Sequence, residues 1–302
     1  MKPSQLIILL ALNFFWAATL SAYKVVAAAL NPADIVTLRF GLAAVSLLVL
    51  WPWLPGTAPR GRDLIKTCVI GALVFVLGHR LQVFGNSLGT AADSSLLMAL
   101  EPLVASVAAA IFLREHIGPR RWCGFAFGIL GVALLKGVWR SDFHWLSLGA
   151  SLIFISSFVC EAAYSVIGKP IIHRAGPVKV LALALAVGTG MNLLWNGAST
   201  VRAATQLSGS AWLIMLALAL ICTSFGYSYW FMVIRESDVS VAALTIFAQP
   251  VFGVALAKFW LGETLHWGQL WGSVAIVVGL MVGLSRQIMV SGPPKDDVEV
   301  GR

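Results

Sequence analysis

The feature that most constrains this chain is a succession of ten apolar runs, each long enough to cross a membrane as a helix. A helix needs about 20 apolar residues to cross roughly 30 Å of hydrocarbon. We expect helices at residues 5–28, 35–54, 64–85, 91–113, 121–138, 146–168, 178–197, 211–233, 240–261 and 268–286. The first run is too long for a signal-peptide core and lacks a small-residue cleavage site, so we expect it to be retained as a membrane helix.

The composition supports a membrane environment. Apolar residues (AVILMFWYC) make up 59% of the sequence and charged residues 11%, whereas a soluble protein carries roughly 25% charged residues to cover its surface. The same numbers exclude a disordered chain, a collagen and a coiled coil. The net charge of +8 does not indicate a nucleic-acid partner, because the basic residues are scattered between apolar runs. We therefore expect an all-α, polytopic protein embedded in the lipid bilayer.

Lys and Arg residues are distributed unevenly between the two sets of loops. With the N-terminus in the cytoplasm, 14 of them fall in cytoplasmic segments, three in the opposite loops and four within the helices. Cytoplasmic loops carry the excess of positive charge in membrane proteins. This orientation is therefore predicted, and an even number of helices returns the C-terminus to the cytoplasm. The polar residues 287–302 are expected to form a disordered cytoplasmic tail.

The second half of the chain repeats the first. A shift of 148 residues superposes seven identities without a gap: Leu96, Pro102, Ala109, Leu113, Glu115, Gly124 and Gly131 match Leu244, Pro250, Ala257, Leu261, Glu263, Gly272 and Gly279. The two repeats, residues 5–138 and 146–286, each hold five expected helices. Because five is odd, the repeats must have opposite orientations in the membrane. Inverted repeats are typical of secondary transporters, whose substrate site lies at the repeat interface near the bilayer midplane.

Three blocks of the first repeat recur in the second. In the first repeat, Pro102 is followed by Leu113-Arg114-Glu115, Trp122-Cys123-Gly124 and Gly131. In the second repeat, Pro250 is followed by Leu261-Gly262-Glu263, Leu270-Trp271-Gly272 and Gly279. With Trp16, Lys24 and Arg39-Phe40 near the N-terminus, this pattern resembles the two EamA domains of the drug/metabolite transporter superfamily, although the usual Trp-Gly is here Trp16-Ala17. The resemblance covers residues 5–286. It implies ten helices, alternating access through a central cavity, and export of amino acids, metabolites or drugs across the cell inner (cytoplasmic) membrane.

Glu101 is the first candidate for a substrate-binding residue. Ionisable groups inside the hydrocarbon are costly and normally face a cavity or a partner. Glu101 lies near the middle of its expected helix, directly before Pro102, and a proline bends a helix and opens room for a ligand. Its repeat partner Gln249 also precedes a proline. We favour a cavity role for both over the alternative, in which Glu101 is a protonated structural carboxyl group bonded to a helix backbone.

Glu161, in the sixth expected helix, is the second carboxylate candidate. Earlier in each half the offset of the repeat is nearer 145 residues, which relates Lys24 to Lys169 and Trp16 to Glu161. A carboxylate and an indole would therefore face one cavity from opposite halves. Carboxyl groups that gain and lose a proton during a cycle would couple transport to protons, and Glu101 and Glu161 are the candidates for this role. Direct binding of a cationic substrate by the same carboxylates predicts the same residues, so both possibilities stay open.

Basic side chains also occur within the expected helices. His79 and Arg80 occupy the outer half of the third helix and are candidates for substrate binding. Arg80 is expected either to pair with Glu101 or Asp93 or to bind a substrate carboxylate. Arg39, one turn into the second helix, is expected to line an outer vestibule.

Further polar and aromatic side chains are expected to complete the substrate site: Asn13, Trp16, Tyr227 and Trp230. Aromatic faces bind apolar bodies and can enclose ammonium groups. Trp16 and Trp230 lie deep within their apolar runs. Most other tryptophans fall at helix ends, where an interfacial belt is expected.

Two other repeated features have structural interpretations. Glu115 and Glu263 lie just beyond their helices at opposite membrane faces, and we expect each to cap the N-terminal end of the following helix. Glycines four residues apart permit close contact of the fifth and tenth helices with their neighbours: Gly124 and Gly128, and Gly279 and Gly283.

Together these features predict a secondary transporter, an exporter, of a small amphipathic cationic or zwitterionic solute. The alternative is a passive facilitator or a channel-like membrane subunit for a small metabolite. No HExxH motif or Gly-rich phosphate loop occurs, and the four cysteines are isolated, so we expect no enzyme activity, cofactor or metal. The expected partners are the solute, the bilayer and, in the coupled case, protons, and the chain is expected to act as a monomer or homodimer.

Overall fold

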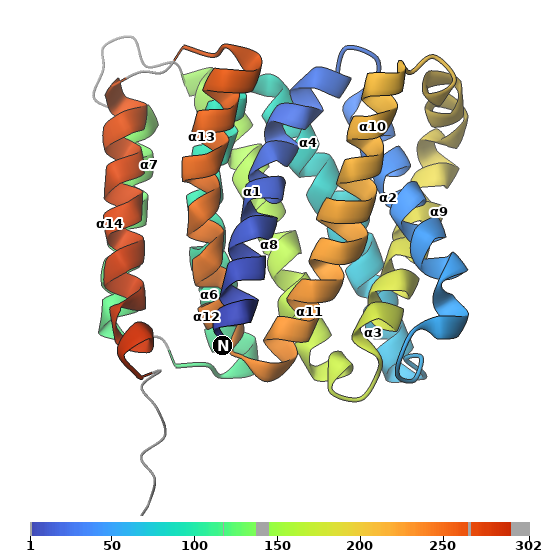
Figure 1. Ribbon diagram of the computed structural model, residues 1–302, viewed down its shortest axis with the longest axis horizontal. Helices are drawn as coiled ribbons and strands as arrows, with labels where there is room; N and C mark the ends of the chain where they lie inside the picture. The colour runs from blue at the N-terminus through green and yellow to red at the C-terminus, as the bar shows by residue number, and fades with distance from the viewer. Residues whose placement is uncertain (1, 117, 137–144, 265–266, 291–302) are drawn as a thin grey trace, which may run out of the picture.

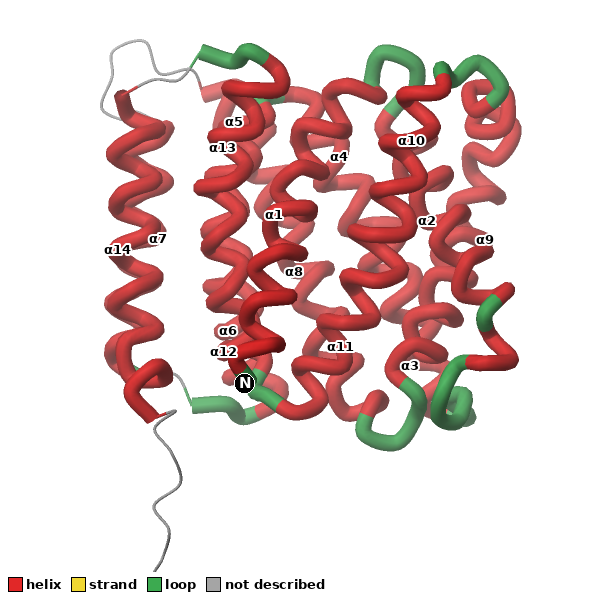
Figure 2. Tube along the Cα trace, viewed as in Figure 1, coloured by secondary structure: helices red, strands yellow, loops and turns green. Residues whose placement is uncertain are grey.

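The computed structural model describes residues 2–116, 118–136, 145–264 and 267–290. Helix is the only regular structure within those ranges, and the helices stand beside one another as an upright bundle (Figure 1). Short loops join the helices at the two ends of this bundle (Figure 2). The prediction of an all-α protein is confirmed.

Among the described residues, eight helical segments are long and apolar enough to cross a membrane: Pro3–Val26, Pro32–Val49, Arg62–Leu88, Ala91–Leu113, Leu148–Ile172, Pro177–Ala204, Gly209–Glu236 and Val239–Leu261. Two shorter apolar stretches, Trp122–Gly131 and Leu270–Gly279, lie within α7 (Pro119–Lys136) and α14 (Trp267–Val290). Every one of these segments falls on an apolar run of the sequence. The chain is therefore a multi-pass membrane protein.

Four membrane segments are single helices: α1 (Pro3–Val26), α2 (Pro32–Val49), α8 (Trp145–Ile172) and α9 (Pro177–Ala204). A short 3-10 turn, η1 (Trp51–Trp53), follows α2. Proline stands in the first turn of α1, α2 and α9, where a missing N–H leaves no helical bond unmade.

Two helix ends differ from the expected positions. The loop expected from residue 197 is largely helical, because α9 continues to Ala204 after a kink at Asn196 (φ −138°, ψ 20°). Beyond the kink the chain contains Ala198, Arg202, Ala203 and Ala204, and Ala and Arg favour helix. α14 continues to Val290, four residues beyond its expected end. The rest of the expected tail, 291–302, and residues 137–138 of the fifth expected helix lie outside the described residues.

The segments Arg62–Leu88 and Gly209–Glu236 each contain a wide π-helical turn. In the first, η2 (Leu73–Gly78) separates α3 (Arg62–Ala72) from α4 (His79–Leu88). In the second, η4 (Leu218–Phe225) separates α10 (Gly209–Ala217) from α11 (Gly226–Glu236). Such turns interrupt the regular helical bonds and occur mostly at functional sites. No pattern in the sequence predicted either turn.

Two other segments are broken by a tight 3-10 turn at their prolines. η3 (Met98–Leu100) separates α5 (Ala91–Leu97) from α6 (Glu101–Leu113), and η5 (Leu244–Phe247) separates α12 (Val239–Ala243) from α13 (Ala248–Leu261). Pro102 and Pro250 lie in the first turn after these breaks, because a proline has no N–H for the preceding turn. Glu101 and Gln249 therefore lie at the start of new helical segments inside the bundle.

The helices of the two predicted repeats pack against each other throughout the bundle. α1 contacts α13, α2 contacts α9 and α6 contacts α8, while α7 packs chiefly against α14 at one edge (Figure 1). At Gly279 an added Cβ would lie 2.7 Å from the Gly124 carbonyl oxygen, so this glycine allows α14 to approach α7 closely. Gly128 has open space beside it, so the close contact depends on the first glycine of that pair.

Glu115 follows α6 and binds the N-terminus of α12. Its carboxylate accepts hydrogen bonds from the backbone N–H groups of Val239 (3.2 Å) and Ser240 (3.3 Å) and from the Ser240 hydroxyl (2.9 Å). Lys169 Nζ lies 3.1 Å from the same carboxylate. Burial raises the pKa of Glu115, but the bonds from Ser240 and Lys169 outweigh it and lower that pKa below its ordinary value. We call these four residues the Glu115 contact.

Glu263 makes the corresponding contact at the other end of the bundle, where α13 ends and α5 begins (Figure 2). It accepts hydrogen bonds from the backbone N–H groups of Ala91 and Ala92, both at 3.0 Å. Lys24 donates to the carbonyl oxygen of Gly89, just before α5. We call these five residues the Glu263 contact.

The prediction that Glu115 and Glu263 cap the helices that follow them was wrong. Each carboxylate instead binds the first turn of a helix in the other predicted repeat, α12 or α5. The first N–H groups of any helix lack intrahelical acceptors, and the fold brings the ends of α6 and α13 to exactly such groups. The two contacts thus fasten the two predicted repeats together at opposite ends.

Candidate functional site

A cavity lies at the centre of the bundle, between helices of both predicted repeats. Eight of the predicted site residues line it: Trp16, Arg39, His79, Glu101, Glu161, Tyr227, Trp230 and Gln249. We call it the central cavity.

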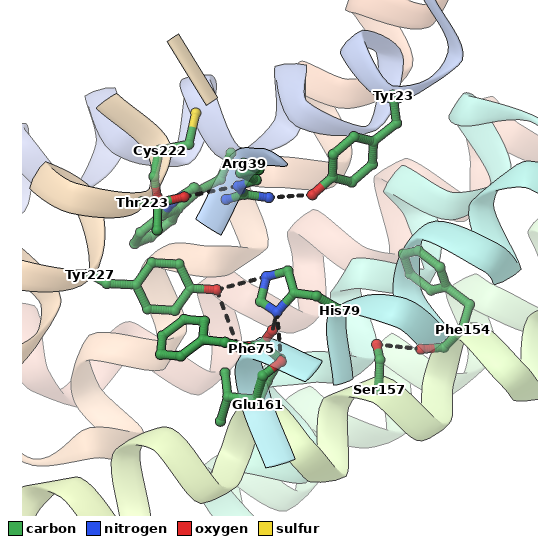
Figure 3. Close-up of polar contacts among 12 residues, drawn as sticks. Tyr23, Arg39, Phe75, His79, Phe154, Ser157, Glu161, Cys222, Thr223 and Tyr227 are labelled. Carbon is green, nitrogen blue, oxygen red and sulfur yellow. Dashed lines mark hydrogen bonds and ion pairs between the residues drawn. The ribbon is translucent and has the colours of Figure 1, made fainter. Parts of the chain in front are cut away.

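Glu161 forms a polar cluster with His79 and Tyr227 on one wall of the central cavity (Figure 3). The Tyr227 hydroxyl donates to Glu161 Oε2 over 3.3 Å and lies 3.1 Å from His79 Nε2. His79 Nδ1 is 3.0 Å from Glu161 Oε1 and 2.9 Å from the carbonyl oxygen of Val74 in the π-helical turn η2. The Nδ1 hydrogen bond goes to Val74, because Oε1 has no hydrogen bond of acceptable geometry despite its proximity. One oxygen of Glu161 thus stays available on the cavity wall.

Glu101 occupies the cavity wall without a polar partner. It is partly buried, stands at the start of α6 after the 3-10 turn, and makes no hydrogen bond or ion pair with any residue that the structure describes. The expected ion pair with Arg80 does not form, since Arg80 binds elsewhere. The carboxylate is therefore free to meet a ligand or a proton.

Gln249 and Asn13 connect α13 to α1. Gln249 Nε2 donates to Asn13 Oδ1 over 2.8 Å, and Asn13 Nδ2 donates to the Thr245 hydroxyl (3.1 Å) and the Leu9 carbonyl (2.8 Å). Gln249 Oε1 is buried without a hydrogen bond. Gln249 lines the central cavity, whereas Asn13 supports it from behind and does not line the wall. The prediction that Asn13 contacts the substrate thus receives no structural support.

Arg39 also lines the central cavity, deeper than expected. Its side chain is 2% exposed, its Nε donates to the Thr223 hydroxyl over 2.8 Å, and its Nη1 donates to the Tyr23 hydroxyl. The prediction that Arg39 lines an outer vestibule receives no structural support, because its side chain lines the central cavity instead. The π-helical turn η4 carries Thr223 inward and gives the guanidinium a partner inside the bundle.

Arg80 lies outside the central cavity. Its Nε donates to Asn192 Oδ1 over 2.8 Å, another of its nitrogens donates to Asn196, and the guanidinium lies 5.2 Å from the ring centroid of Trp195. All three partners belong to α9. The substrate-binding prediction for Arg80 was wrong in its location, because neighbours in sequence such as His79 and Arg80 point to different sides of one helix.

Trp16, Tyr227 and Trp230 form an aromatic wall of the central cavity. The ring of Trp16 makes edge contacts with both others, at centroid distances of 6.2 Å. The indole N–H of Trp16 donates to the Cys222 carbonyl in η4 over 2.8 Å, and that of Trp230 donates to the Ser165 hydroxyl over 2.9 Å. Both indoles are therefore held in place with their polar atoms satisfied, which leaves apolar faces toward the cavity.

Sequence reasoning missed several groups that shape this site. Tyr164 donates to the Tyr227 carbonyl over 3.0 Å, and it could have been found because it follows Glu161 at helical spacing. Thr223 and the carbonyls of Val74 and Cys222 could not, because they become available only through the π-helical turns. Within the described ranges, no group of three His, Cys, Asp or Glu side chains could hold a metal ion.

Apolar helices that enclose a polar and aromatic cavity define a multi-pass membrane protein built around an internal binding site. Residues 3–136 and 147–284 match the model of the EamA-like transporter family. The chain therefore belongs to the EamA-like transporter family, and its resemblance to EamA domains is confirmed.

Similar proteins cover nearly the whole chain. An uncharacterized transporter of Archaeoglobus fulgidus is 26% identical over 270 residues, which are 89% of this chain and 94% of the relative. A probable terminal-alkyne amino-acid exporter of Streptantibioticus cattleyicolor is 24% identical over 272 residues, 88% of this chain and 89% of the relative. A solved crystal structure superposes with a TM-score of 0.69 at 19% identity and covers 97% of this chain and 100% of the other, so it shares the fold.

Proposed function

We propose that the protein is a secondary active transporter that binds its solute in the central cavity and exposes it to each side of the membrane in turn. The observation that carries this proposal is the group of unsatisfied polar side chains there: Glu101 without a partner and Glu161 with a free oxygen. Unpaired polar groups in a membrane interior are costly. A bound solute that pairs with these polar groups would offset that cost.

Ten membrane-spanning helices in two inverted repeats, residues 5–138 and 146–286, would support such a cycle. The end contacts favour this arrangement, because their parts correspond under the sequence repeat. Lys169 donates to the Ser237 carbonyl as Lys24 donates to the Gly89 carbonyl, and Glu115 binds α12 as Glu263 binds α5. Rocking of one repeat against the other around a fixed central site is the usual mechanism of transporters with inverted repeats.

The proposed solute is small, amphipathic and positively charged or zwitterionic: an amino acid, a metabolite or a drug. Glu101 and Glu161 supply negative charge, and the aromatic wall supplies apolar faces beside it. Export is the proposed direction, by analogy with the relative named as a probable amino-acid exporter. The proposed location is the cell inner membrane, with both termini in the cytoplasm and the chain acting as a monomer or homodimer.

Proton coupling is proposed through the same carboxyl groups. A Glu101 side chain that holds either a proton or the solute, but not both, would exchange one for the other across the membrane. A passive facilitator would use the same cavity without this competition. An imposed pH gradient separates the two, because only the coupled protein accumulates solute against its gradient.

The experiment is counterflow in proteoliposomes with a panel of amino acids and cationic drugs, with and without a pH gradient. Glu101→Gln is expected to lower saturable uptake about 100-fold, the effect of losing one charged contact. The matched control is Glu236→Gln, the same change at an exposed residue that touches only Lys2 and Gln5. Undiminished uptake by Glu101→Gln would contradict the proposed site. Uptake that does not respond to the pH gradient would contradict proton coupling but not the proposed binding site.

A further inference from the structure

Arg39 is a buried cation that the protein does not neutralise. Its side chain is 2% exposed, and its hydrogen bonds go to two uncharged hydroxyl groups, those of Tyr23 and Thr223. No carboxylate of the described residues lies within 4.0 Å of it. A guanidinium cannot shed its proton in a protein, so the charge persists. Burying a charge without a counter-ion is strongly unfavourable.

Neither carboxyl group of the central cavity pairs with Arg39. Glu161 accepts a hydrogen bond from Tyr227 and lies beside His79, and Figure 3 shows these two side chains between Glu161 and Arg39. Glu101 stands on the same cavity wall without a partner among the described residues. The cavity therefore keeps a guanidinium and a carboxyl group that do not pair with each other, although an ion pair would be the cheaper arrangement in a low dielectric.

The guanidinium has donors left for a ligand. Arginine has five N–H groups in a planar fork, and the two bonds to Thr223 and Tyr23 use Nε and Nη1. Nη2 has no partner among the described residues. Phe40 lies 5.2 Å from the guanidinium carbon, and with the two bonds it fixes the plane of the fork. A preorganised fork of this kind binds a carboxylate with two parallel hydrogen bonds.

We propose that Arg39 binds a carboxylate of the transported solute while Glu101 binds its ammonium group. The site then selects a zwitterion whose apolar or aromatic body lies against Trp16, Tyr227 and Trp230, and it rejects the corresponding amine that lacks the carboxylate. This rests on the proposed function, since it assigns the solute of the same central cavity. Thr223 and Tyr23 are positioning residues for the fork, not contacts of the solute.

The test compares three probes that share one aromatic body: L-phenylalanine, L-phenylalaninamide and 2-phenylethylamine. Thermal unfolding of the purified full-length protein is followed with each probe, together with counterflow in proteoliposomes. Wild-type protein is expected to favour L-phenylalanine over both of the others by about tenfold in apparent affinity, the loss of one ionic contact. Arg39→Gln is expected to remove that preference and to leave the weak response to the amine unchanged.

Two further variants keep the result interpretable. Arg39→Lys keeps the charge but not the fork and is expected to retain only part of the preference. Arg80→Gln removes another arginine of the membrane segments, whose partners lie in α9, and is expected to keep the full preference even if it unfolds at a lower temperature. A folded Arg39→Gln protein that still prefers the zwitterion, or a folded Arg39→Lys protein with the full wild-type preference, overturns the proposal.

Different results would overturn the role of Arg39 and the transporter proposal. Equal responses of the wild-type protein to all three probes, or no response to any of them, overturn the carboxylate role of Arg39. If Glu101→Gln abolishes transport of another solute while Arg39→Gln leaves it unchanged, the transporter proposal stands and the role of Arg39 falls. If neither variant changes transport of any solute, the central cavity is not the substrate site and both proposals fall.

Discussion

The ends of the bundle and its centre differ in whether their polar side chains are paired. In the Glu115 contact and the Glu263 contact, each carboxylate accepts at least two hydrogen bonds from an N-terminal helical turn. In the central cavity, the described part of the chain supplies no partner for Glu101, no donor for Gln249 Oε1 and no counter-ion for Arg39. Satisfied polar groups hold helices together, whereas unsatisfied ones are available to a ligand. The difference separates residues that maintain the fold from residues proposed to act on a solute.

The two end contacts also differ from each other. Lys169 lies 3.1 Å from Glu115 and completes an ion pair, whereas Lys24 donates to backbone carbonyls and makes no ion pair with Glu263 among the described residues. The Glu115 contact is therefore expected to be the stronger. In an alternating-access cycle, the more weakly fastened end is the one expected to separate first.

After Glu101→Gln, the largest expected effect on transport comes from Glu161→Gln. The change keeps the shape of the side chain but removes the charge that holds His79 and Tyr227 in one cluster. We expect transport to fall by a factor of about 30 to 100, as expected for the loss of one strong polar contact, while the unfolding temperature stays near that of the wild type. A large drop in unfolding temperature without loss of transport would indicate that Glu161 maintains the fold and does not act on the solute.

The largest expected effect on stability comes from Glu115→Ala. It leaves Lys169 and the first N–H groups of α12 without their partner. Breaking a partly buried charged network of this kind costs about 2–4 kcal/mol. Chemical unfolding in detergent measures it, with Glu236→Ala as the exposed control. A cost no larger than that of the control would show that the Glu115 contact does not fasten the bundle.

Glu263→Ala is expected to cost less, about 1–2 kcal/mol, because only backbone N–H groups lose a partner. The same unfolding assay compares it directly with Glu115→Ala. Equal costs would remove the distinction between the two end contacts, and a larger cost at Glu263 would reverse it.

A smaller expected effect is the pH dependence of the stabilisation by the Glu115 contact. The pKa of Glu115 is lowered in the folded protein, chiefly by Ser240 and Lys169 acting against burial. Its stabilising contribution is therefore complete above the ordinary value of 4.5 and is lost as the pH falls through the lower folded value. Unfolding measured between pH 7 and pH 3 is expected to show this loss in the wild type and not in Glu115→Gln. Identical pH profiles for the two proteins would contradict the lowered pKa.

The positions of the helices could be predicted because membrane crossing fixes both their length and their polarity. The repeat related Glu101 to Gln249 correctly, since both precede a proline in the first turn of a helix that follows a 3-10 turn. The neighbours of Arg80 could not be predicted, because a sequence gives the depth of a residue along its helix but not which helix faces it. The inward position of Arg39 depended in the same way on Thr223 in a π-helical turn that no pattern revealed.

The most direct test of the functional role of the central cavity measures both transport and stability in two variants. Glu101→Gln and Glu115→Gln are each assayed for counterflow per folded protein in liposomes and for unfolding in detergent. The account predicts that Glu101→Gln abolishes counterflow with unfolding unchanged, and that Glu115→Gln lowers stability while the folded fraction still transports. If Glu101→Gln instead transports normally and unfolds more easily, the central cavity is a structural feature and the claim is wrong.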